Sequence, residues 1–148
     1  MLDVPGPHFA LSELLIILAA ILCAARLGKA RMWLALAGSL LLGVIAAIGA
    51  IRFGTGQLDA WADIHQAFSQ IGGAIAMSLI AAQLLVLCIS TGSKASIGIY
   101  GVVLASAALA LLLPPATMPL FLIWLVVAIV AAALLPAQTP RTRVLRAA

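Results

Sequence analysis

Residues 33 to 53 read WLALAGSLLLGVIAAIGAIRF, and this stretch decides the fold class. From Trp33 to Ile51 it contains no charged residue. A transmembrane α-helix needs about 20 consecutive, mostly apolar residues, because each residue rises ~1.5 Å through a hydrocarbon core ~30 Å thick. The stretch therefore predicts a membrane-spanning helix, with Trp33 where an aromatic side chain anchors a helix end at the interface.

Further apolar runs lie on both sides of this stretch. They cover about residues 9–25, 67–90, 95–113 and 117–135, and the segments between them are short and contain Gly, Pro or charged residues. The 148 residues are 66% hydrophobic and 8% charged, whereas soluble domains have ~25% charged residues. A chain this apolar has no surface to present to water. We therefore expect a single transmembrane domain over residues 1–136 with lipid as its solvent.

The basic residues are divided unequally between the two ends of the expected helices. One end has only Arg52, and the other has seven basic residues: Arg26, Lys29, Arg31, Lys94, Arg141, Arg143 and Arg146. Cytoplasmic loops are enriched in Lys and Arg, and the same division argues against a re-entrant pair in the last two, shorter runs. The sequence thus predicts an all-α, polytopic integral membrane helical bundle of five transmembrane helices in the cell (inner) membrane, N-terminus out and C-terminus in.

Both ends of the chain fit this orientation. No Lys or Arg precedes the first apolar run, so the run lacks the basic n-region of a secretory signal peptide, and we expect it to be a retained span. The tail, residues 137–148, has three arginines and no acid. We expect this basic cytoplasmic tail to lie on anionic lipid, with partner docking as the alternative. Basic residues confined to the ends of apolar runs do not suggest nucleic acid as a partner.

Small residues recur at helical spacing on several of the expected spans. The second span has such a stripe at Ser39, Gly43, Ala46 or Ala47, and Ala50. The fourth has one at Gly98, Gly101, Ala105 and Ala108. Because spans associate where small residues let backbones approach closely, we expect these stripes to pack inward. The fifth span is apolar all round and is expected to face lipid or a partner.

Two histidines lie at the expected outer ends of different spans. His8 precedes the first span and His65 precedes the third, and Met118 lies at the same level in a Pro-rich connection. Side chains of this kind can bind a b-type haem, or with a Met can bind copper. The alternative is that both histidines are hydrated side chains at the membrane interface.

Glu13 lies about one turn inside the first apolar run. Ionisable groups within a span are costly, so such a residue indicates a proton or ion pathway by default. Arg52, Asp59 and Asp63 are further candidates for this pathway. The alternatives are an interfacial carboxylate that reaches the headgroups and a structural ion pair between Glu13 and Arg52.

The expected spans also contain amide and thiol side chains. Gln70 and Gln83 fall in the third span, where interhelical hydrogen bonding is the ordinary explanation and substrate contact the alternative. Cys23 and Cys88 form no CxxC motif and are expected at the cytoplasmic ends of their spans. We expect them to be reduced packing residues without a disulfide.

The sequence leaves three functions open. It contains no GxSxG, phosphate-binding glycine loop or HExxH motif, so an enzyme is not expected. Small loops and few polar groups favour a non-catalytic or accessory subunit of a larger membrane complex, with other membrane subunits as partners. The second possibility is a small haem- or metal-binding electron-transfer protein that uses His8 and His65. The third is a small proton-coupled transporter that uses Glu13 and works as a homo-oligomer.

Overall fold

The computed structural model describes residues 8–89 and 93–138, and for residues 93–94 and 136–138 it describes the backbone alone. The tail arginines, Arg141, Arg143 and Arg146, lie outside the described residues, and so does the side chain of Lys94. Every regular element in the described part of the chain is helical. The elements are α1 (His8–Lys29), α2 (Trp33–Gly54), α3 (Ala62–Ala67), the π-helical segment η1 (Phe68–Gly72), α4 (Gly73–Ile89), α5 (Ser93–Leu112), the 3₁₀ turn η2 (Pro114–Ala116) and α6 (Thr117–Gln138).

Five helical stretches are long and apolar enough to cross a membrane. They are His8–Lys29, Trp33–Gly54, Ala62–Ile89, Ala95–Leu112 and Pro114–Leu135. The predicted class, an all-α polytopic membrane protein with five spans, is therefore confirmed. The third span begins at Ala62 and not near residue 67, because α3 continues through η1 into α4 without a break.

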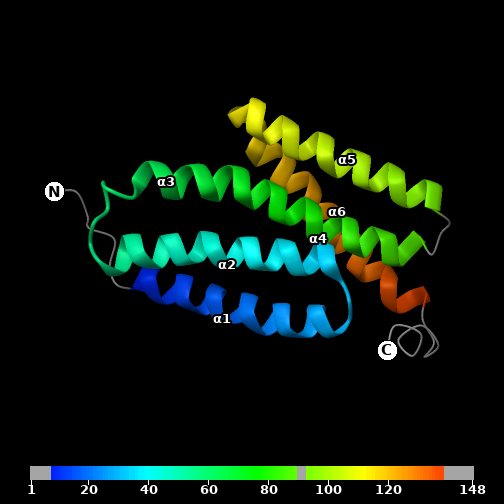
Figure 1. Cartoon of the computed structure of the whole chain (residues 1–148), viewed down its shortest axis with the longest axis horizontal. Coiled ribbons are helices and arrows are strands. Elements are labelled where there is room, and N and C mark those ends of the chain that lie inside the picture. The colour runs from blue at the N-terminus through cyan, green and yellow to red at the C-terminus, as the bar shows by residue number, and fades with distance from the viewer. Residues whose placement is uncertain (1–7, 90–92, 139–148) are drawn as a thin grey trace.

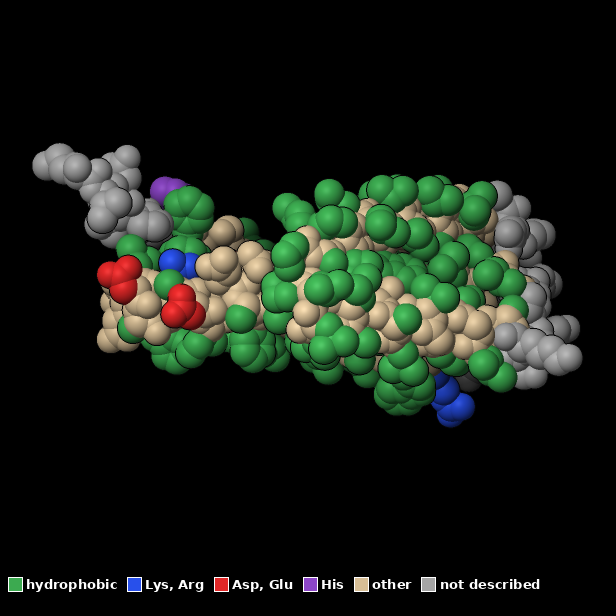
Figure 2. Space-filling model, turned by 90° about the horizontal axis from the view of Figure 1, so that it is seen from above, with side chains coloured by type: hydrophobic (Ala, Val, Ile, Leu, Met, Phe, Trp, Pro, Cys, Tyr) green, Lys and Arg blue, Asp and Glu red, His purple; other side chains and the backbone are tan. Residues whose placement is uncertain are grey.

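Helices α1, α2 and α3–α4 lie side by side as a layer with α2 in the middle (Figure 1). Helix α4 also contacts α5 and α6, which pack mainly against α4 and only slightly against each other. Helix α4 therefore joins the layer to the last two spans. Figure 2 shows hydrophobic side chains over most of one face of the bundle, with acidic and histidine side chains gathered at one end.

The helices pack through small residues. Buried alanines supply most of the core, including Ala46 on α2 and Ala76 on α4. A Cβ on Gly38 would lie 2.7 Å from the carbonyl oxygen of Ala76, so α2 and α4 can approach this closely only because residue 38 is glycine. On the far side of α4, Trp124 of α6 packs with Ala81 and with other apolar residues. Many large apolar side chains remain exposed, as expected where lipid is the solvent.

The stripe on the fourth span does not pack within the chain. Gly98 and Gly101 are exposed, and a Cβ on either glycine would have no neighbouring heavy atom within 4 Å. Helix α5 instead meets the core through Ile99 and Val103. The expectation that this stripe packs inward is wrong for the isolated chain, because periodicity identifies a face of small residues and not the neighbour that covers it.

Candidate functional site

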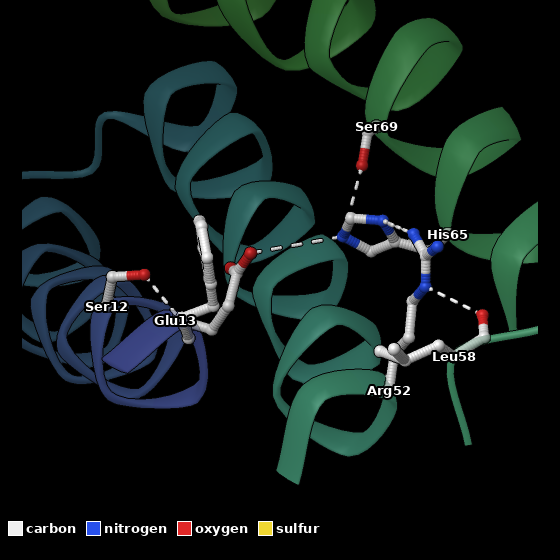
Figure 3. Close-up of polar contacts among 7 residues, drawn as sticks. Ser12, Glu13, Arg52, Leu58, His65 and Ser69 are labelled. Carbon is white, nitrogen blue, oxygen red and sulfur yellow. Dashed lines mark hydrogen bonds and ion pairs between the residues drawn. The ribbon is translucent and has the colours of Figure 1, made fainter. Parts of the chain in front are cut away.

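Three spans bring polar side chains together near the end of the bundle that contains the α2–α3 connection (Figure 3). Glu13 comes from α1, Arg52 from the last turn of α2, and His65 from α3. The Glu13 Oε1 atom lies 3.9 Å from His65 Nε2. The Glu13 and His65 side chains are only 18% and 16% exposed. The structure thus joins three residues that are separated in sequence. We call Glu13, Arg52, His65 and Ser69 the outer polar cluster, after the end of the spans that the distribution of basic residues predicts to lie outside.

Arg52 determines which nitrogen of His65 carries the proton. Its Nε donates to the carbonyl oxygen of Leu58 at 3.0 Å, and its Nη1 lies 3.3 Å from His65 Nδ1. A guanidinium can only donate, so Nδ1 must accept. The imidazole in this arrangement is therefore neutral, with its proton on Nε2. That N–H faces the Glu13 carboxyl group and the Ser69 Oγ, which lies 3.5 Å away.

Gly49 leaves space for the side chains of Glu13 and His65. A Cβ built on this buried glycine would lie 2.6 Å from Glu13 Oε1 and 2.9 Å from His65 Nε2. Both side chains consequently lie over bare backbone of α2, one turn before Arg52. Gly49 was not among the site residues predicted from the sequence. The available signal was its spacing of three residues from Arg52, which places both residues on one helix face.

Ser69 belongs to the π-helical segment η1, which directly follows α3. Single π-helical turns within α-helices are rare and occur frequently at functional sites. On its other side, η1 borders a hollow of about 620 Å³ that also touches α6. The lining residues are Ser69, Gln70, Pro114, Pro115, Thr117, Met118 and Phe121. Ser69 thus lines this hollow, which we call the η1 hollow, and also contacts the ring of His65.

The two histidines do not face one another. His8 stacks on Phe9 at a ring-centroid distance of 4.6 Å, Phe9 lies 5.6 Å from Phe53, and Phe53 meets the His65 ring edge-on at 5.7 Å. Two phenyl rings thus lie along the path between the imidazoles. Both nitrogens of His65 already contact protein groups. Within residues 8–89 and 93–138, no group of three or more His, Cys, Asp or Glu side chains is arranged to hold a metal ion.

The remaining candidates fall outside the outer polar cluster. Asp59 and Asp63 are exposed on the α2–α3 connection and on α3. Met118 lines the η1 hollow and is 65% exposed. Gln70 is exposed and lines the same hollow. Gln83 lies elsewhere, where its Oε1 accepts a hydrogen bond of 3.3 Å from the backbone N–H of Leu34 on α2.

The outer polar cluster has the parts of a proton-exchange site. A carboxyl group faces an imidazole N–H, and Ser69, whose hydroxyl group contacts that imidazole, also lines the η1 hollow. Carboxyl, imidazole and hydroxyl groups can each take and pass a proton. No protein-family model, curated protein or solved structure matches the chain.

Proposed function

We propose that this protein is a small proton-coupled membrane transporter in which Glu13 binds and releases the proton, and in which the neutral ring of His65 holds the Glu13 carboxyl group in place. The observation that carries the proposal is the 3.9 Å approach of the two ionisable side chains within apolar spans. Carboxylates inside a membrane are costly and usually serve ion or proton movement. The Arg52 guanidinium contacts Nδ1 of His65 and thereby orients the ring.

The η1 hollow is the proposed substrate site. Its volume of about 620 Å³ falls within the ~300–1,000 Å³ of ordinary small-molecule pockets. Its walls are largely apolar, and Ser69 and Gln70 add hydroxyl and amide groups. This chemistry suits a small amphipathic solute with at least one hydrogen-bonding group. Ser69 contacts His65 as well, so a bound solute can influence the proton site through one side chain.

The proposed orientation follows from the division of basic residues. Seven basic residues against one favour a cell inner membrane with the N-terminus outside and the C-terminus in the cytoplasm. The outer polar cluster and the η1 hollow then lie toward the external side. Five spans are few for a carrier, so the working unit is proposed to be a homo-oligomer, which in soluble proteins is most often a two-fold dimer.

Proton flux in liposomes tests the proposal. The purified protein is reconstituted in liposomes that contain a pH-sensitive dye, an inside-acid gradient is imposed, and small amines, carboxylates and neutral amphiphiles are added in turn. At least one solute class should alkalinise the interior with wild-type protein. Glu13→Gln should reduce this signal to that of empty liposomes, because an amide cannot exchange the proton.

Asp63→Asn is the matched control, since it removes an acidic group that is exposed on α3 and outside the cluster. This variant should transport like the wild type. The proposal fails if no solute class moves protons, or if the Glu13→Gln protein moves them at the wild-type rate.

A second candidate is a non-catalytic subunit of a larger membrane complex. It is favoured by the exposed stripe of small residues on α5, which includes Gly98 and Gly101 and lacks a neighbour within this chain. Small residues of this kind permit close approach of a partner helix. Purification from native membranes in mild detergent should then recover other membrane subunits in fixed stoichiometry. Recovery of the chain alone or as a homo-oligomer would count against this candidate.

A further inference from the structure

A second hollow opens between α1, α2 and α4. Its volume is about 500 Å³. The lining residues are Ile16, Ala19, Ala20, Cys23, Arg26, Leu27, Met32, Ala35, Ser39, Leu42, Ile80 and Leu84. It exists because α1 and α4 both pack on α2 with little direct contact between them. Figure 1 shows α2 between the other two helices. We call this hollow the α2 groove.

The α2 groove has an apolar interior that follows the direction of the spans. Small buried residues such as Ala20, Ala35 and Ser39 form its floor, and larger aliphatic side chains such as Ile16 and Ile80 line it as well. An unfilled space of this kind forfeits dispersion contacts along its walls. In a bilayer the material available to fill it is a lipid acyl chain.

A positive charge stands at one end of the groove. Arg26 is among the lining residues, and Lys29 and Arg31 follow at the same end of the bundle. None of the residues that line the groove is acidic. Guanidinium groups bind phosphate groups through paired, charge-assisted hydrogen bonds. Basic pockets between transmembrane helices are known to receive anionic lipid headgroups.

We propose that the α2 groove is a binding site for one anionic phospholipid, with an acyl chain along the groove and the phosphate at Arg26. The position of the acids favours lipid over a second copy of this chain. Glu13, Asp59 and Asp63 lie at the other end of the spans from Arg26. A second copy in the same orientation would therefore bring to Arg26 no acidic side chain from residues 8–89 or 93–138, whereas phospholipid phosphates lie at that depth in the bilayer.

Native mass spectrometry tests this site directly. The protein is reconstituted in liposomes of equal phosphatidylglycerol and phosphatidylcholine with identical acyl chains, extracted in mild detergent, and the lipids retained per chain are counted. Wild-type protein should retain one phosphatidylglycerol in clear excess over phosphatidylcholine. Arg26→Gln should remove the excess, and Ala19→Leu should lower retention because its side chain enters the groove.

Each variant has a matched control. Arg143→Gln removes the same charge from the C-terminal tail, whose expected contact with the lipid surface should not hold a lipid through detergent extraction. Ala25→Leu adds the same volume to α1 at a position that does not line the groove. Both controls should retain phosphatidylglycerol like the wild type. The proposal is overturned if the two lipids are retained equally, if Arg143→Gln acts as strongly as Arg26→Gln, or if lipid is replaced by a second copy of the chain.

Discussion

The Arg52 guanidinium lies 3.3 Å from the Nδ1 atom of His65, and Glu13 approaches the same ring at Nε2. A group that is always protonated thus contacts one nitrogen and a group that can ionise contacts the other. The neutral imidazole therefore has one nitrogen that Arg52 orients and one N–H that faces the Glu13 carboxyl group. This division of roles underlies the first prediction.

His65 should be the Nε2–H tautomer. Nitrogen-15 NMR of protein labelled at histidine distinguishes the two tautomers, and His8, the only other histidine, provides an internal reference. Arg52→Gln should allow both tautomers at His65, because it removes the guanidinium that contacts Nδ1. An Nδ1–H signal from His65 in the wild-type protein would contradict the assigned geometry.

Gly49→Ala should destabilise the protein by about 1–3 kcal/mol, the usual cost of overpacking. The added methyl group would overlap both Glu13 and His65, so the same variant should lose proton-linked flux. Thermal unfolding in detergent measures the first effect. Gly98→Ala is the control, since its methyl group meets nothing within the chain, and it should be neutral or stabilising by up to about 1 kcal/mol.

Gln83→Leu should cost about 1–2 kcal/mol of stability. Met32 gives α2 no side-chain cap, and the Gln83 amide of α4 instead accepts from the N–H of Leu34 in the first turn. Leucine leaves that N–H without its partner in an apolar setting. Gln70→Leu should be nearly neutral, because Gln70 is exposed on the same span. Equal losses of stability in Gln83→Leu and Gln70→Leu would contradict a stabilising role for the hydrogen bond from the Leu34 N–H to Gln83.

Cys23 should react with a small membrane-permeable maleimide faster than Cys88. Cys23 is exposed on α1, whereas the Cys88 Sγ donates to the Ala131 carbonyl oxygen at 3.2 Å between α4 and α6. Intact-mass analysis in detergent counts the labels, and peptide mapping assigns them. Preferential labelling of Cys88 would contradict the packing of α4 against α6.

The number and extent of the spans could be predicted because the bilayer requires long, uninterrupted apolar helices. Helix α2 begins at Trp33, as the hydropathy pattern indicates. Conformation inside the connections was harder to predict. Between the first two spans, the residue with positive φ is Arg31 at 55°, whereas Gly28 lies within α1. The π-helical geometry of η1 has no sequence signature at all.

The types of residue in the outer polar cluster could be predicted, but their partners could not. Glu13, Arg52 and His65 stood out as ionisable groups at one end of the spans, yet Asp59 and Asp63 shared that property and lie outside the cluster. Hydropathy does not specify which helices are neighbours or which faces meet. Gly49 could not be identified from the sequence because it contributes no side chain to the cluster. Its lack of a Cβ matters only because the side chains of Glu13 and His65 occupy the space above it.

Helix α2 provides two of the residues that position the side chains of the outer polar cluster. Gly49 supplies the surface on which Glu13 and His65 lie, and Arg52, one turn further along α2, orients the ring. Displacement of α2 along its axis by a single turn, ~5.4 Å, would remove the surface and the guanidinium together. Glu13 and His65 would then lose their contact in one step. The contact between these two side chains therefore depends on the axial position of α2 relative to α1 and α3.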